Sequence, residues 1–375
     1  MEDERVARVW LSGVCEPGDV SVWRMVKALG AVEAVAAIQR GRVHRESGAT
    51  EKKVTGWGMR AGAFDLEGAL FICAQYGGRV VCPGDAEWPS TLDQLGESAP
   101  LLLWVRGELD LRAVCLRSVA VVGARAATPY GIRAAADLGA ELSDRGWTVV
   151  SGGALGIDGA AHRGALAADG NTVAVLASGV DVAYPPRHEG LFAEIAAKGL
   201  LVSEWPPTAH PTRPRFLVRN RVIAALTRGT VVVEADLRSG ALNTAHHARS
   251  LGRQLMAYPG PVTSLMSRGC HDLLRASPPH TRLVTGVDDV LEEVGPIGEG
   301  LDRPDGRPIL PRDHLDPDTR AVLEAIPAGP RGTPTHAIAA AASLDLPTTR
   351  SRLALLAATG FTTRTRTGWR LNPPT

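Results

Sequence analysis

Lysine is nearly absent from this chain. Of its 41 basic residues four are lysine and the rest are arginine, and they balance 40 acidic residues to give a formal net charge of +1. This balance excludes a protein that is basic over its whole surface. Any attraction for an acidic partner therefore depends on how arginine is clustered locally.

Paired cysteines and long apolar runs are also missing. The five cysteines (Cys15, Cys73, Cys82, Cys115 and Cys270) form no CxxC pair and have no metal-ligand spacing. The first residues, MEDERVARVW, are charged and lack the apolar core of a signal peptide. No run approaches the roughly 18 apolar residues of a membrane span. We therefore expect a cytoplasmic protein with buried, unpaired cysteines, no bound metal and no membrane span.

The common nucleotide-binding motifs are missing as well. The turn after the apolar run at 118–122 reads GARAATPYG, which is not G-x-G-x-x-G, and no G-x-x-x-x-G-K-[ST] loop occurs. Redox and nucleotide-hydrolysis chemistry are therefore disfavoured, and no cofactor is predicted. Asp158 and His162 lie four residues apart, as an acid/base pair could. We favour a structural interpretation, in which Asp158 caps a helix or bonds a neighbouring loop and holds His162.

A chain of 375 residues is long enough for two or three domains. Residues 1–78 contain helical apolar spacing, as in VSVWRMVKALGAVEAVAAI, and predict a small helical domain. Residues 295–318 hold five prolines and four glycines without periodicity, and predict a linker. These segments separate a central domain, 79–294, from a C-terminal domain, 319–375.

The central segment alternates short apolar strands with helices. Strands such as SVAVV, TVAVL and TVVV are apolar throughout, and each leads into a helical pattern. This alternation predicts an α/β fold, a Rossmann-like, doubly wound and mostly parallel sheet with helices on both faces. Ligands of such sheets bind beyond the carboxyl ends of the strands. Three glycine-bearing turns, VVGARAATPYG, VVSGGALGIDGAAH and VLASGVDVAYPP, occupy those ends. Their amides, together with Arg125, could hold a phosphate.

The C-terminal segment predicts three helices, near 318–326, 335–342 and 348–359, followed by the strand-like GFTTRTRTGWRLN. Three helices and a basic hairpin form the outline of a winged helix. The region from Leu346 to Thr375 contains five arginines and no acidic residue. This region could contact either duplex DNA or a protein partner, and the sequence leaves both interpretations open. The candidate contact residues are Arg350, Arg352, Arg364 and Arg366, with Arg370 nearby.

The stretch RPRFLVRNR, residues 213–221, places four arginines around one phenylalanine. We interpret it as a connection between two strands, at the carboxyl edge of the sheet. A solvated charged surface would explain its composition. A nucleic-acid contact would also explain this composition, because guanidinium groups pair with phosphate and an aromatic ring stacks on a base.

Several motifs together resemble the DNA-processing protein A family, also called Smf. They run in order from VAVVGARAATPYG and VVSGGALGIDGAAH through LLVSEWPP, FLVRNRVIAAL and VVVEADLRSGALNTA to MAYPG. The resemblance implies an N-terminal helical, SAM-like domain, the Rossmann-like domain and a C-terminal winged helix. It also implies a protein of DNA uptake and recombination that binds and protects single-stranded DNA, loads the RecA recombinase onto it and forms a homodimer.

The same resemblance implies a DNA-binding site and no catalytic residues. By motif, the site comprises Gly123, Arg125, Ser151, Gly152, Gly153, Arg213, Phe216, Arg219, Asn220 and Arg221. The chain departs from the family at Leu155, where many members have an arginine. Arg213 and Arg215 could supply the missing charge.

Two other functions stay open on the sequence. One is a nucleotide-binding enzyme similar to phosphoribohydrolases, although VVVEADLRSGALNTA lacks their P-G-G-x-G-T turn and following glutamate. The other is a winged-helix transcription factor acting through the C-terminal domain.

Overall fold

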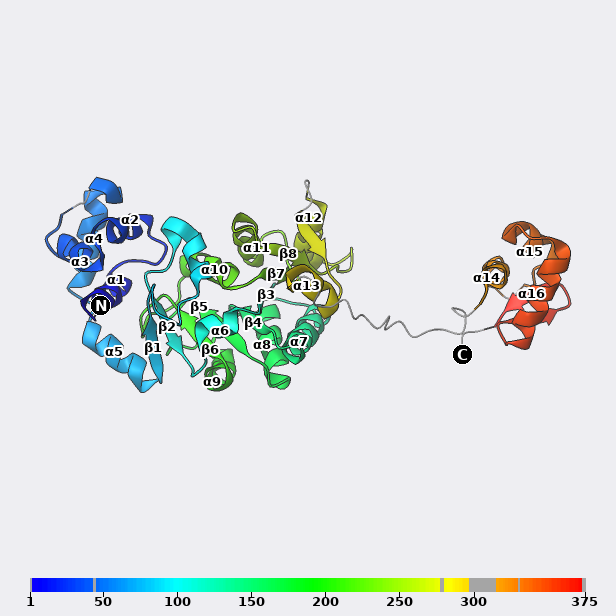
Figure 1. Cartoon of the computed structure of the whole chain (residues 1–375), viewed down its shortest axis with the longest axis horizontal. Coiled ribbons are helices and arrows are strands. Elements are labelled where there is room, and N and C mark those ends of the chain that lie inside the picture. The colour runs from blue at the N-terminus through cyan, green and yellow to red at the C-terminus, as the bar shows by residue number, and fades with distance from the viewer. Residues whose placement is uncertain (1, 43–44, 277–279, 297–314, 330, 373–375) are drawn as a thin grey trace. The chain divides into compact units, whose positions relative to one another are not determined.

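The computed structural model describes residues 2–42, 45–276, 280–296, 315–329 and 331–372. The chain divides into two compact units, Met1–Leu301 and Asp302–Thr375, which are drawn in Figure 1. The helices near the N-terminus and the central sheet thus belong to one unit. Most of the predicted linker, residues 297–314, lies outside the described residues. The domain boundaries at 78 and 294 stay predictions.

The first part of the chain is helical, as its apolar spacing predicts. Three helices begin with a side-chain cap, from Asp19, Thr50 and Asp65, which satisfies a backbone amide that would otherwise lack a partner. Apolar side chains including Leu11, Met25 and Trp57 form the shared core. The elements are α1 Glu2–Val14, α2 Val20–Leu29, α3 Ala31–Gln39, η1 Arg45–Ser47, α4 Glu51–Ala61 and α5 Leu66–Gln75.

The centre of the first unit is a nine-stranded sheet. Its strand order is β1-β2-β6-β5-β4-β3-β7-β8-β9; β1–β2 and β2–β6 are antiparallel pairs, and the other pairs are parallel. The predicted α/β, mostly parallel fold is confirmed. The strands are β1 Gly78–Val81, β2 Leu103–Arg106, β3 Ser118–Val122, β4 Thr148–Ser151, β5 Thr172–Leu176, β6 Leu200–Ser203, β7 Gly229–Val232, β8 Gln254–Ala257 and β9 Thr281–Leu283.

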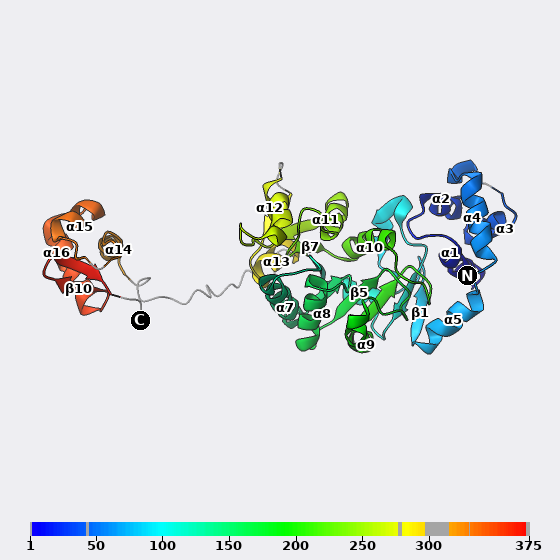
Figure 2. The ribbon, with the colours of Figure 1, turned by 180° about the vertical axis from the view of Figure 1, so that it is seen from behind.

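Helices cover both faces because alternate residues of each central strand point to opposite sides. In β3, Val119 and Val121 pack with α7, α8 and α13, whereas Ala120 and Val122 pack with α10 and α11. Figures 1 and 2 show α10 and α11 on one side of the strands and α7 and α8 on the other. The elements are η2 Ser90–Ser98, α6 Leu111–Cys115, α7 Pro129–Asp144, α8 Ile157–Ala167, η3 Pro186–His188, α9 Glu189–Lys198, α10 Arg213–Leu226, α11 Ala241–Ser250, η4 Leu265–Ser267, α12 Arg268–Arg275 and α13 Val287–Val294.

The interpretation of RPRFLVRNR as a connection is wrong. Arg213 begins α10, and Pro214 occupies the first turn, where its missing amide hydrogen removes no helical bond. The second half of the helix, Val222–Leu226, is buried on every side between the sheet and its neighbours. The helix therefore presents its arginines at fixed positions, some toward solvent and some toward the interior.

Within its described residues, 315–329 and 331–372, the second unit contains three helices and a two-stranded antiparallel hairpin, as predicted. Val322, Ile338 and Leu353 are fully buried in its small core. The elements are α14 Pro317–Glu324, α15 Thr335–Ala342, α16 Leu346–Ala358, β10 Thr362–Thr365 and β11 Gly368–Leu371. Its assignment as a winged helix stays a prediction.

Other expectations from composition can be compared with the described residues. All five cysteines are buried and unpaired, as predicted. Within the described ranges, no helix has the length and apolar character needed to cross a membrane. Among the same residues, no cluster of three or more histidine, cysteine or acidic side chains is arranged to hold a metal ion.

Candidate functional site

A groove of about 730 Å³ lies at the carboxyl ends of the parallel strands, where the strand order reverses between β3 and β7. One wall is the turn after β3, residues 123–126. Residues 236–241, after β7, form another wall, and the N-terminal half of α10 forms a third. We call it the carboxyl-edge groove. The rule for doubly wound sheets predicts this position.

Six of the ten predicted site residues line this groove: Gly123, Arg125, Arg213, Phe216, Arg219 and Asn220. They come from two segments almost 90 residues apart, which the fold brings together. The other four, Ser151, Gly152, Gly153 and Arg221, are buried outside its lining. Whether any of the ten contacts DNA stays a prediction.

Aromatic and guanidinium groups stack inside the groove. The guanidinium of Arg125 lies over the ring of Phe216, 4.6 Å from its centroid. The ring of Tyr184 also lies beside Phe216, with centroids 5.6 Å apart and ring planes tilted by 45°. Arg125 and Tyr184 are exposed and Phe216 is half-buried. These three side chains offer flat surfaces to a ligand without first having to unpack a core.

The backbone amides of the glycine turns are largely occupied. The Asp158 carboxylate accepts hydrogen bonds from Gly152 N at 3.1 Å and Ala154 N at 3.4 Å. Glu234, only 1% exposed, accepts from Thr128 N at 2.8 Å and from Thr128 Oγ1 at 2.6 Å, at the start of α7. Each carboxylate lies at the positive end of a helix. The expectation that these amides face a phosphate is therefore wrong for these donors.

Arg219 supports the groove from beneath. It is 4% exposed, and its Nη1 donates to Gly152 O at 2.8 Å and also to Val175 O. Burial lowers the pKa of Arg219 to about 10, while the Asp158 carboxylate opposes that shift. Arg219 therefore keeps its charge at neutral pH. Its hydrogen bond to Gly152 O connects α10 to the turn after β4.

Ser151, Gly152 and Gly153 also have structural contacts. The Ser151 hydroxyl donates to Val121 O at 2.6 Å, and Gly153 O accepts from His188 Nδ1 at 3.0 Å. A Cβ on Gly152 would lie 2.3 Å from the Arg219 guanidinium. Glycine is therefore needed there to let Arg219 approach, and the turn acts on the groove through that arginine.

Arg215 and Arg221 point away from the groove lining. Arg221 forms a two-pronged ion pair with Glu204, at 2.5 and 2.7 Å, and both side chains are 5% exposed. Arg215 pairs with Glu16 at 2.6 Å and lies over the Trp205 ring. Burial acts to raise the pKa of Glu16, but hydrogen bonds from Arg215 and Trp205 outweigh it and hold that pKa low. Arg215 therefore does not replace the arginine missing at position 155.

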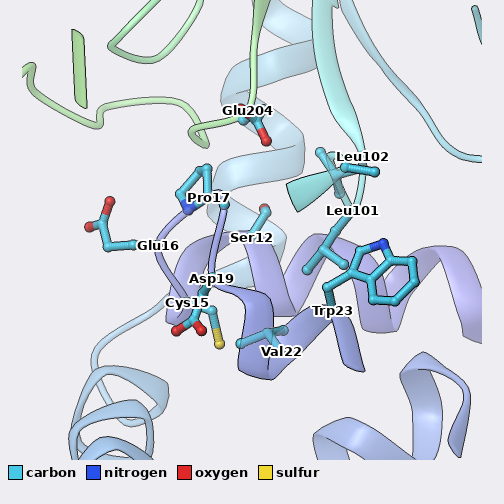
Figure 3. A pocket seen from close by; sticks show the side chains of 12 residues that line it. Ser12, Cys15, Glu16, Pro17, Asp19, Val22, Trp23, Leu101, Leu102 and Glu204 are labelled. Carbon is cyan, nitrogen blue, oxygen red and sulfur yellow. The ribbon is translucent and has the colours of Figure 1, made fainter. Parts of the chain in front are cut away.

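Figure 3 shows the small pocket beside these ion pairs, where the loop after α1 meets the segment that leads into β2. Cys15, Glu16 and Glu204 lie around it. Its volume of about 20 Å³ is close to that of one water molecule. This contact between the N-terminal helices and the sheet is thus packing, and the pocket is too small for an organic ligand.

Asp158 and His162 do not form a pair. Asp158 bonds the neighbouring loop, as expected, but His162 is held by Thr172 instead, with Nδ1 2.7 Å from Thr172 Oγ1. Because that hydroxyl already donates to Val149 O, Nδ1 is the donor to it. Burial lowers the pKa of His162 to about 3, so the ring is neutral at physiological pH. His162 is therefore a core residue.

Tyr184 and Arg238 are among the lining residues that were missed from the sequence. Arg238 is exposed and follows β7, the strand beside β3, so the switch-point rule could have identified it. Tyr184 ends the third glycine-bearing turn. The exposed cations of the groove are thus Arg125, Arg213 and Arg238. The partly exposed Asp236 also belongs to its lining.

Comparisons with known proteins show which proteins this chain resembles. The family model for DNA recombination-mediator protein A matches residues 79–295. A DNA processing protein DprA of Mycobacterium tuberculosis is 47% identical over 345 residues, covering 88% of this chain and 85% of that protein. The X-ray structure of DprA from Streptococcus pneumoniae has a TM-score of 0.65 at 31% identity, covering 78% of this chain and 98% of that one. A Helicobacter pylori DprA structure, described for its single-stranded DNA binding mode, has a TM-score of 0.52 at 27% identity, covering 58% and 96%.

Proposed function

This chain belongs to the DNA recombination-mediator protein A family, and we propose that it binds single-stranded DNA in the carboxyl-edge groove. The observation that carries this proposal is the stacked set of Arg125, Phe216 and Tyr184, open to solvent at the switch point of the sheet. Arginines beside exposed rings suit a strand whose phosphates and bases are both accessible.

In the proposed complex, phosphates contact Arg125, Arg213 and Arg238, because the amides of the glycine turns already serve Asp158 and Glu234. One base stacks on Phe216 and its neighbour reaches Tyr184. Stacking on a ring face tolerates any base, so we expect little dependence on sequence. Arg219 and Asn220 position these groups, and Arg221 is left out of the proposed contact set.

The direct test compares fluorescence anisotropy of a labelled single strand with that of a duplex of equal length, at two salt concentrations. We expect tighter binding of the single strand in both buffers, because a duplex keeps its bases stacked within the helix. Equal affinity for the duplex would reject the proposal. It would instead support the transcription-factor alternative, which acts through the C-terminal unit.

Removing one exposed arginine should change the salt dependence of DNA binding by the amount expected for one phosphate contact. For Arg125→Ala and for Arg213→Ala we expect weaker binding and a log–log salt slope shallower by about 0.7, the value of one phosphate contact on a single strand. The measurement is a titration at four or more salt concentrations.

Arg112→Ala is the matched control for those two variants. Arg112 is exposed on α6, directly before β3, and therefore lies toward the opposite edge of the sheet. We expect it to bind with the slope of the unchanged protein. If all three variants share one slope, the phosphate contacts lie elsewhere.

We infer a binding protein rather than an enzyme. The two buried carboxylates nearest the groove, Asp158 and Glu234, each accept hydrogen bonds from the backbone. These bonds give both carboxylates a structural role in the turns, which supports a binding site rather than a catalytic one. Incubation with nucleoside monophosphates tests this inference, because release of free base would favour the phosphoribohydrolase alternative.

RecA loading, a cytoplasmic location and a homodimer are proposed from family membership. Light scattering of the intact chain should give twice the 39.5 kDa of one copy. A mass of one copy at micromolar concentration and above would reject the dimer.

The C-terminal unit is proposed as a winged helix that contacts duplex DNA or a protein partner. Arg350 and Arg366 are exposed there, and Arg364 lies over the Trp369 ring. Arg352 already lies near Asp316 and Asp318, at 3.5 and 3.7 Å. Arg350 and Arg366 are therefore the better candidates for such a contact.

A further inference from the structure

A second pocket lies on the outer side of α7 and holds about 310 Å³. Tyr130, Asp137 and Glu141 line it from one side, at helical positions separated by seven and four residues, which places them on one face of α7. Tyr258, after β8, and Thr285, after β9, close the other side. We call it the α7 pocket. Its lining shares no residue with the carboxyl-edge groove.

Tyr258 is the unusual residue of this pocket. The side chain is only 6% exposed, and its ring packs with Val287 and Val290 in the core of that face. Within the part of the chain that the structure describes, its hydroxyl forms no hydrogen bond, and the oxygen is not among the fully enclosed polar atoms that lack a partner. Because Tyr258 lines the pocket, this oxygen is open to a ligand there. The other tyrosine of the pocket differs, because the Tyr130 hydroxyl donates a hydrogen bond to Pro259 O at 2.6 Å.

The surroundings of that hydroxyl are acidic. Asp137, Glu141 and Tyr130 line the pocket together with Tyr258. Burial raises the pKa of Tyr258, and Glu141, Tyr130, Asp289 and Asp137 raise it further. Thr285 holds the Asp289 carboxylate with two hydrogen bonds of 2.7 Å. A positive group entering the pocket would thus meet several carboxylates and one oxygen that can accept a hydrogen bond.

We propose that the α7 pocket binds the side chain of an arginine from a protein partner. A guanidinium can lie against the Tyr130 ring while it donates to the Tyr258 hydroxyl and to the carboxylate of Glu141 or Asp137. The chain carries a guanidinium of its own at the rim, because Arg133 Nε lies 3.6 Å from Asp137 Oδ2. Both members of that pair are largely exposed, so it contributes little and a partner can displace it.

The test uses the intact chain labelled with ¹³Cζ-tyrosine. There are four tyrosines, so the spectrum reports Tyr258 and Tyr130 together with two internal controls, Tyr76 and Tyr184. The probe is N-acetyl-arginine N-methylamide, and its uncharged counterpart is N-acetyl-citrulline N-methylamide. We expect a saturable shift of the Tyr258 signal with the arginine probe and none with citrulline. An unmoved Tyr258 signal, or equal shifts with both probes, would overturn the proposal.

Variants separate pocket binding from general charge attraction. Glu141→Gln should weaken binding of the arginine probe several-fold. Tyr258→Phe should also weaken binding, and in that variant the Tyr130 signal serves as the reporter. Asp144→Asn removes a charge from the end of α7 outside the pocket lining, and should bind as the unchanged protein does. Arg133→Gln should tighten binding, because it removes the competing guanidinium. Equal losses in Glu141→Gln and Asp144→Asn would reject a specific pocket.

A polyamine is the alternative source of a cation on an aliphatic stem. Spermidine is therefore titrated in the same experiment. If it shifts Tyr258 at lower concentration than the arginine probe does, the pocket is a polyamine site and the proposal of a protein partner is wrong.

Discussion

Arg221→Ala should cost about 3–5 kcal/mol of the free energy of unfolding. The substitution leaves Glu204 buried without its partner, and both side chains are 5% exposed in the native protein. It also removes the donor to Ser98 O, at 2.9 Å, which joins α10 to η2. Urea denaturation followed by circular dichroism measures the loss. We expect a clearly lower urea midpoint, since a typical domain has only about 5–15 kcal/mol of stability.

The double variant Arg221→Met with Glu204→Met is the control for that experiment. Replacing both members of a buried ion pair by apolar groups of similar volume is often neutral or stabilising. We therefore expect the double variant to recover most of the lost stability. It should also bind single-stranded DNA, because Arg221 does not line the carboxyl-edge groove. A stable Arg221→Ala protein with impaired DNA binding would show that this arginine acts on the strand after all.

The central sheet could be predicted because its strands are apolar on both faces and regularly spaced. The same reasoning failed at α10. Its second half, Val222–Leu226, is buried on every side, so the sequence has no helical periodicity there. Its first half attracts attention by its charge, and Pro214 suits the first turn of a helix as well as a connection.

The candidate site was predicted by position and less well by role. Arg213, Arg219 and Arg221 look equivalent in the sequence, yet one is exposed and two are buried. What separates them is the rotation of α10 against the sheet, which is set by tertiary packing. The pairing of Glu234 with Thr128 joins segments more than 100 residues apart. No local pattern shows that the turn amides are already occupied.

Phe216→Ala should cost about 1–3 kcal/mol of single-strand affinity, or roughly a 5- to 150-fold increase in Kd. The expected loss comes from base stacking, so the salt slope should stay nearly unchanged, unlike that of Arg125→Ala. The ring is half-buried, and it contacts Arg125 and Tyr184 rather than belonging to a core cluster. We therefore expect the melting temperature to change little, and anisotropy titrations with thermal melts measure both quantities.

Phe71→Ala and Phe216→Trp are the matched comparisons for this prediction. Phe71 is 63% exposed on α5, so its loss tests the effect of removing a surface ring away from the carboxyl-edge groove, and binding should be unchanged. Tryptophan at 216 keeps a stacking face and should retain most of the affinity. If Phe216→Ala is folded and binds like the parent while Arg125→Ala binds weakly, the groove holds phosphates alone. The strand would then lie with its bases turned away from α10.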